Sequence, residues 1–147
     1  QHVFGIKSPK VALMHMGEDE KKGPVNLQST YQLLKTVKHL NFIGNIEGRD
    51  LLNAKADVIV CDGSTVNVIL KLAESFCDIL IARNLTDSFV ERFNYETFGG
   101  SPILGLNGNV IISHGFSSSL AIKNSLLLAH QMAQSNIHER ISDMFSS

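Results

Sequence analysis

The chain has 147 residues, of which 44% are hydrophobic and 18% are charged, so it can bury a core and is not a disordered protein. Its net charge of −1 gives no support for non-specific nucleic-acid binding, which requires a basic face. Two cysteines exclude a disulfide scaffold and indicate a reducing, intracellular setting, and no run of 18 apolar residues predicts a membrane span.

The first half of the sequence alternates between strand-like and helix-like segments. In chain order we expect a buried strand over residues 10–16, a charged loop, a helix over 24–38, a strand over 41–46, a short helix that carries Leu51 and Leu52, and a strand over 57–61. This alternation is typical of an α/β domain with a mainly parallel, layered sheet and flanking helices.

The second half begins with the most regular helical pattern in the sequence. Residues 65–82 carry a broad apolar face, and we expect most of this helix to be buried. The elements expected after it are a short helix over 86–93, a Gly/Pro loop over 94–102, a strand over 110–113, a helix over 118–136 and a loosely docked tail to residue 147. We expect residues 1–147 to form a single α/β domain.

Three apolar, strand-like runs end in small polar loops that open into helices. These loops are residues 47–50, 62–65 and 114–118. Ligands of open α/β folds bind at the carboxyl ends of parallel strands, where helix N-termini present N–H groups and partial positive charge. The repetition predicts that the three loops surround one anion site, most simply a site for a phosphoryl group.

The second loop, Asp62-Gly63-Ser64-Thr65, has the strongest local signal. Asp62 is a candidate base or orienting group, and Ser64, Thr65 and the N–H groups near Gly63 are candidate phosphate donors. The alternative is that Asp62, Ser64 and Thr65 only cap the helix, as these residue types commonly do.

The other loops contribute cations. Arg49 suits bidentate binding of phosphate, and its alternative is a surface ion pair with Asp50 or Glu47. His114 can polarise a carbonyl or bind an anion, and its alternative is a hydrogen bond to a loop carbonyl. Asn67 and Lys71 begin a polar stripe along the helix over 65–82, which either faces the site or is a solvent-exposed face.

No pattern predicts a metal or a cofactor. The six histidines are scattered without metal-ligand spacing, and no phosphate-binding Walker motif or dinucleotide fingerprint occurs. Cys61 and Cys77 lie in apolar runs, so we expect inert, buried thiols.

The three loops and their flanking residues resemble the bacterial phosphate acyltransferase family known as PlsX. The matching segments are residues 11–17 with Glu18, Glu20 and Gly23; 44–52; 56–63 with Asn67, Val68, Leu70 and Lys71; Tyr95 with 98–108; His114 with Gly115; and 121–124.

This resemblance implies an enzyme that forms acyl phosphate from acyl-(acyl carrier protein) and inorganic phosphate in phospholipid synthesis. It also implies an isopropylmalate-dehydrogenase-like fold, a homodimer, a cytoplasmic location and weak peripheral contact with the membrane. Family members are roughly twice as long, and the chain begins at Gln1 without an initiator methionine. We therefore expect a C-terminal portion of a longer enzyme.

The resemblance also implies a set of site residues. We expect Asp62, His114 and Lys71 to be catalytic, and phosphate or substrate to be bound by Asn45, Glu47, Gly48, Arg49, Gly63, Ser64, Thr65, Asn67, Gly115, Lys123 and Asn124. The chain departs from the family at Val66, where glycine is usual, and in the short segment 78–94, which carries only two cations.

Two other interpretations remain open. In the first, the chain is a non-catalytic piece that dimerises and binds anions. A piece that holds only half of a two-part active site would bind anions without turning over substrate. In the second, the chain is a nicotinamide-dependent hydroxyacid dehydrogenase on a related fold, which the lack of a dinucleotide fingerprint disfavours.

Overall fold

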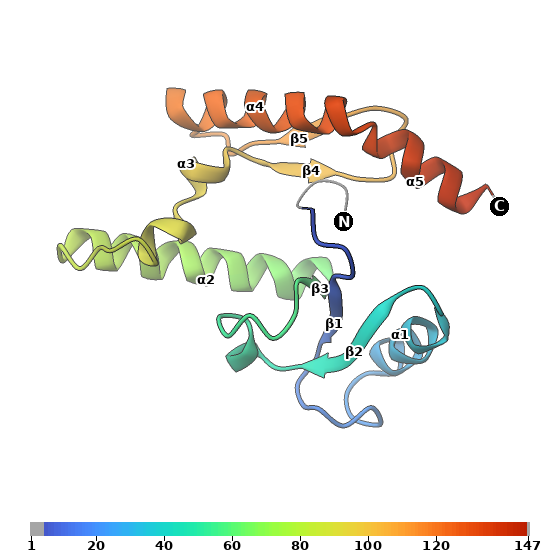
Figure 1. Ribbon diagram of the computed structural model, residues 1–147. Helices are drawn as coiled ribbons and strands as arrows, with labels where there is room; N and C mark the ends of the chain where they lie inside the picture. The colour runs from blue at the N-terminus through green and yellow to red at the C-terminus, as the bar shows by residue number, and fades with distance from the viewer. Residues whose placement is uncertain (1–4, 147) are drawn as a thin grey trace. The chain divides into compact units, whose positions relative to one another are not determined.

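The computed structural model describes residues 5–146, and the expectation drawn from Gln1 lies outside them. The described chain divides into two compact units, residues 5–66 and residues 67–146. Its elements (Figure 1) are β1 (Lys10–Met14), α1 (Val25–Thr36), β2 (Asn41–Ile46), the short 3-10 turn η1 (Gly48–Asp50), β3 (Val58–Val60), α2 (Gly63–Ala82), the 3-10 turn η2 (Val90–Phe93), α3 (Tyr95–Phe98), β4 (Ser101–Ile103), β5 (Val110–Ile112), α4 (Ser119–Ser135) and α5 (Ile137–Phe145).

The first unit is built on a parallel three-stranded sheet in the order β2-β1-β3. Strand β1 lies between its two partners (Figure 1), and residues 11–15 are all buried. The uninterrupted apolar run of residues 11–14 is typical of a strand that is covered on both faces. The expected α/β fold with parallel strands is therefore confirmed for this unit.

Strand β2 carries an irregularity just before its carboxyl end. Val11 pairs with Phe42 and Leu13 pairs with Asn45, so two steps along β1 match three along β2. Gly44 lies in the extra step and has a φ of +95°, a conformation that side chains other than glycine adopt with strain. The bulge sets the direction in which Asn45 and the following loop leave the sheet.

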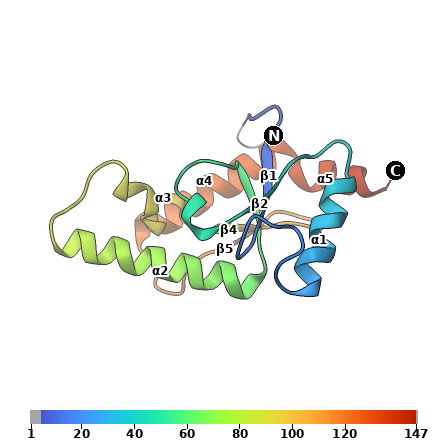
Figure 2. The same cartoon turned by 90° about the horizontal axis from the view of Figure 1, so that it is seen from below.

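The second unit contains the body of α2, an antiparallel pair of strands and the last helices. After α2 the chain turns back and returns to α3 (Figure 2), which packs on α4. Gly99 follows α3, and a Cβ atom there would collide with the backbone of α4 at Ser125 and Ala121. Glycine at this position therefore permits the close approach of α3 and α4.

Helix α2 has the expected extent but not the expected burial. Among its residues only Cys77 is buried, whereas Val68, Leu72 and Phe76 are 67%, 69% and 60% exposed. Burial of this helix within the chain is not observed, because its apolar side chains surround more of the helix than the described residues cover, and burial between copies stays a prediction.

Four further expectations for the second unit are corrected. The segment over 94–102 is not a plain loop, because the Asn94 side chain accepts a hydrogen bond from the Glu96 N–H and so caps α3. The tail forms α5, set off from α4 by Asn136 in the left-handed conformation. Only residues 90–93 of the expected short helix are helical. Strand β5 pairs antiparallel with β4 in a separate sheet, so the third loop does not follow a strand of the parallel sheet.

Within residues 5–146 no helix combines the length and the apolar character that crossing a bilayer requires.

Candidate functional site

The carboxyl ends of the three parallel strands bring three loops to one edge of the first unit. His15 follows β1, Glu47 follows β2 and Cys61 follows β3. Two of the three predicted loops, residues 47–50 and 62–65, therefore share this sheet edge, together with the charged loop after β1. The shared edge is the position at which open α/β sheets bind ligands.

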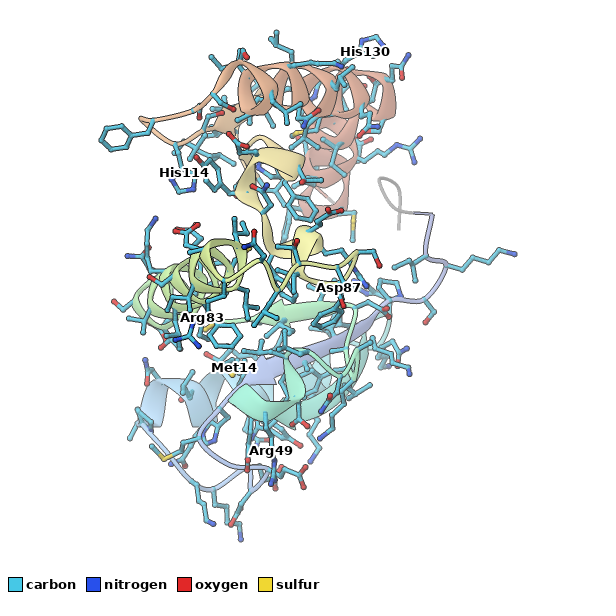
Figure 3. The ribbon with its side chains drawn as sticks, turned by 90° about the vertical axis from the view of Figure 1, so that its left-hand side faces the viewer. Met14, Arg49, Arg83, Asp87, His114 and His130 are labelled. Atoms are coloured by element: carbon cyan, nitrogen blue, oxygen red, sulfur yellow. The ribbon has the colours of Figure 1, made fainter. Side chains whose placement is uncertain are left out.

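The turn that carries Arg49 is rigidly closed. The Glu47 N–H donates to Asp50 Oδ2 over 3.0 Å, and the Glu47 side chain accepts in return from the Asp50 N–H, which makes a capping box. Arg49 Nε lies 3.1 Å from Glu47 Oε2, while the Arg49 side chain is 72% exposed (Figure 3). The ion pair that was the alternative for Arg49 is thus present, yet most of the guanidinium faces solvent, where it can meet an anion.

Lys55 connects two loops of this edge. Its Nζ lies 3.0 Å from Glu18 Oε1, in the loop after β1, and 3.2 Å from Asp50 Oδ2, in the Arg49 turn. The hydrogen bonds to Glu18 and Asp50 raise the pKa of Lys55. The hydrogen bond from the Glu47 N–H lowers the pKa of Asp50, and the hydrogen bond and charge of Lys55 lower it further, by a smaller amount. Sequence reasoning missed Lys55, because Lys55 lies outside the recognised loop 47–50 and one of its partners, Glu18, is 37 residues away.

This network predicts acid sensitivity of the first unit. Because folding lowers the pKa of Asp50, its contribution to stability is present above the unfolded pKa, about 3.9, and is lost as the pH falls through the lower folded value. We expect the urea midpoint, followed by circular dichroism, to fall below about pH 4. Asp50→Asn should weaken that fall, and Asp78→Asn on α2 should not. Equal effects of the two variants would contradict the role of Asp50.

The loop after β3 uses its carboxylate to start α2. Asp62 Oδ1 accepts hydrogen bonds from the N–H groups of Ser64 and Thr65, at 3.0 and 2.9 Å, and Oδ2 accepts from the Thr65 hydroxyl at 2.5 Å. These hydrogen bonds lower the pKa of Asp62, and the bond from the Thr65 hydroxyl has the largest effect. Asp62 is therefore a well-ionised helix cap and a weak base, and the Ser64 and Thr65 amides already have an acceptor.

A free thiol, Cys61, lies beside this loop. Burial, followed by the negative charge of Asp62, raises the pKa of Cys61, so the thiolate is disfavoured. Cys61 is half-buried and Cys77 is buried, and both are free cysteines.

Two polar side chains are buried where β1 and β2 end. His15 Nδ1 lies 2.9 Å from the Gly17 carbonyl oxygen, and His15 Nε2 has no hydrogen-bond partner among residues 5–146. Asn45 Oδ1 has no partner there either. A Cβ atom on Gly23 would fall 2.5 Å from His15 Nε2, so glycine is needed where the loop covers the imidazole. Asn45 was a predicted site residue, and His15 was not.

In the second unit, Glu74 joins two of the predicted catalytic residues. Glu74 Oε2 lies 2.8 Å from Lys71 Nζ, and Glu74 Oε1 lies 3.5 Å from His114 Nε2. The His114 ring also meets the Tyr95 ring edge-on, with 5.0 Å between centroids. Lys71 and His114 are therefore brought together through Glu74, which was not among the predicted site residues. The spacing of three residues between Lys71 and Glu74 was a usable signal.

A cavity of about 250 Å³ lies beside this group. Its lining includes Leu70, Ala73, Glu74, Arg92, Phe93, Tyr95, Phe98 and His114. All of these residues belong to the second unit. The cavity is therefore formed within the second unit alone.

The remaining predicted residues have more modest surroundings. Asn124 Nδ2 donates to the Glu96 carbonyl oxygen over 2.8 Å, which ties α4 to α3. The others are exposed or half-exposed: Gly48, Gly63, Asn67, Gly115 and Lys123. The third loop does open a helix, since the Ser118 side chain caps α4 by accepting from the Ala121 N–H. Its sharing of one pocket with the first two loops stays a prediction. Among residues 5–146 no group of three His, Cys, Asp or Glu side chains is arranged to hold a metal ion.

Comparison with known proteins gives a consistent result. The sequence model of a family described as "Fatty acid synthesis protein" matches residues 1–140. A phosphate acyltransferase of Dictyoglomus turgidum is 41% identical over 160 residues, which cover 96% of this chain and 48% of that protein. Phosphate acyltransferases of Chlorobaculum parvum (39% identity, 99% of this chain, 50% of that protein) and Syntrophomonas wolfei (42%, 93% and 44%) also match. The chain spans about half the length of these curated relatives.

Proposed function

The chain belongs to the family described as fatty acid synthesis proteins, and from this premise we propose that it takes part in a phosphate acyltransferase reaction. In this reaction inorganic phosphate attacks the thioester of an acyl-(acyl carrier protein). A carbon–oxygen bond forms to phosphate and the carbon–sulfur bond breaks. The carrier thiol leaves with the proton of the attacking hydrogen phosphate, and acyl phosphate is the product.

Binding of phosphate is supported by the arrangement of side chains at the carboxyl-terminal edge of the parallel sheet. The exposed guanidinium of Arg49 is presented there on a turn fixed by the Glu47–Asp50 capping box, and Lys55 ties that turn to the loop after β1. A fixed cation at a strand-end loop binds an anion with little reorganisation. Phosphate would exchange one interaction of Arg49, the pair with Glu47, for a stronger bidentate contact.

The sequence left two roles open for Asp62, a base or an orienting group, and we propose that it is the orienting group. Its lowered pKa makes proton abstraction from phosphate unfavourable, whereas its hydrogen bonds fix the first turn of α2. For His114 we propose stabilisation of charge on the thioester oxygen, supported by its position beside Glu74 and Lys71.

We further propose the finer properties that the family resemblance implies. These are an isopropylmalate-dehydrogenase-like fold for the whole enzyme, a homodimer, a cytoplasmic location and weak peripheral contact with the membrane. The exposed apolar side chains of α2 and α4, such as Leu72 and Leu126, support an interface between copies. Exposed Leu85 and Phe89, between Arg83 and Arg92, support the membrane contact.

The experiment is an assay of acyl-phosphate formation, trapped as the hydroxamate, from acyl-(acyl carrier protein) with and without inorganic phosphate. It is run with this chain and with the chain joined to any natural upstream segment. Phosphate-dependent product in either sample is the expected result. Product in neither sample would contradict the proposal and favour an anion-binding module, and binding of NAD, followed by fluorescence, would favour a dehydrogenase.

A further inference from the structure

The cavity of the second unit has an apolar wall. Leu70 and Ala73 of α2, Phe93 of η2, and Tyr95 and Phe98 of α3 all line it. Its volume, about 250 Å³, is just below the roughly 300 Å³ at which pockets for drug-sized ligands begin.

Polar side chains also line the same cavity. Arg92 and His114 supply basic side chains, and the carboxylate of Glu74 is held by Lys71 at 2.8 Å. Figure 3 shows His114 projecting from the loop between β5 and α4, on the side that faces α2. The negative charge of Glu74 is therefore matched by the ion pair with Lys71, and Arg92 is left as a cation for a bound anion.

From this combination we infer that the cavity binds the acyl chain of the substrate and product, with the acyl phosphate head toward Arg92 and His114. The inference rests on the proposed function, because that function supplies a ligand with an apolar tail and an anionic head. The lining matches both parts: apolar side chains remove the tail from water, and Arg92 pairs with the phosphoryl group of the product, whereas Arg49 is proposed above for incoming inorganic phosphate.

The probe is a series of alkylphosphonates with ethyl, butyl, hexyl and decyl tails, which are stable mimics of acyl phosphate. Binding to the full chain is measured by calorimetry. Each methylene that enters the cavity should raise the affinity about fourfold, and the gain should stop once the tail fills it. Affinity that does not depend on tail length would overturn the inference.

Two variants on α2 locate the tail. Ala73→Phe places a large side chain in the cavity and should lower the affinity for decylphosphonate at least about tenfold. A loss of this size is smaller than the affinity that two buried methylene groups contribute. Ala82→Phe is the matched control, since Ala82 is an exposed residue of the same helix outside the cavity lining. Equal affinities of the two variants would overturn the inference. Circular dichroism checks that both are folded.

A second pair tests the head group and does not depend on cavity filling. Arg92→Met should lower the affinity for decylphosphonate about tenfold or more and leave the affinity for decanol unchanged. The variant removes only the ion pair with the charged head group, which decanol does not have. Arg83→Met, an exposed arginine that does not line the cavity, should change neither. Loss of decanol binding in Arg92→Met would overturn the assignment of the head.

The outcome is separable from that of the proposed function. Acyl-phosphate formation that continues unchanged in Ala73→Phe, with decylphosphonate still bound, overturns the acyl subsite and leaves the function standing. If sedimentation instead shows that Ala73→Phe converts a dimer to a monomer while binding is retained, the cavity belongs to an interface between copies and the inference is overturned. Loss of tail-dependent binding supports the subsite whether or not the chain turns over.

Discussion

Replacing Gly99 by alanine lowers the free energy of unfolding by about 3 kcal/mol, because two penalties act at one residue. Its φ is +76°, which an L side chain adopts with strain. A Cβ atom would also collide with the backbone N–H of Ser125 and would lie 2.6 Å from the carbonyl oxygen of Ala121. These atoms belong to the helix backbone of α4, so they cannot rotate away. Urea unfolding followed by circular dichroism measures the effect.

The matched control is Gly108→Ala in the same unit. No atom lies within 4 Å of a Cβ built there, and its φ is not positive, so the change should cost less than about 1 kcal/mol. Equal destabilisation by both substitutions would show that the approach of α3 to α4 is not the cause. Because α3 begins with Tyr95, which contacts His114, Gly99→Ala should also reduce binding in the adjacent cavity.

Replacing Arg49 by alanine raises the KM for phosphate roughly 10- to 100-fold, the effect of losing a charge-assisted hydrogen bond. The fold should persist, since the Arg49 side chain is 72% exposed and the capping box of its turn uses Glu47 and Asp50. Arg49→Lys should recover part of the affinity, because lysine keeps the charge but not the bidentate geometry. The measurement is the phosphate dependence of acyl-phosphate formation.

Arg83→Ala, an exposed arginine of the second unit, serves as the control for a general loss of positive charge. It should leave the KM for phosphate unchanged. An unchanged KM in Arg49→Ala would remove Arg49 from the site. Comparable increases in both variants would indicate long-range attraction of phosphate rather than a contact.

Local signals in the sequence located the main elements. The strand over 41–46 has the predicted bounds, and α2 and α4 begin and end within two residues of those expected. Their apolar periodicity and cap residues are close in sequence, so they can be recognised without the fold. The capping role that was the alternative for Asp62 is observed, with the Ser64 and Thr65 amides as its donors.

Features that depend on distant partners were missed. Lys55 has partners 37 and 5 residues away, and its ion pairs follow from the way β1 and β2 place their loops. The antiparallel pairing of β5 needs β4, a strand of three residues that includes Pro102 and has no strand-like pattern. Burial of α2 depends on what covers it, and a broad apolar face in a sequence does not reveal that.

The position of β1 has a consequence for synthesis of the chain. This strand is synthesised before its partners β2 and β3, yet it lies at the centre of its sheet and gains its second neighbour only when residues 58–60 have been made. Until then the apolar segment 11–14 has no complete partner and can associate with other nascent chains. Slower translation between β1 and β3 should therefore lower the yield of correctly folded protein, and a chaperone that shields this segment should restore it.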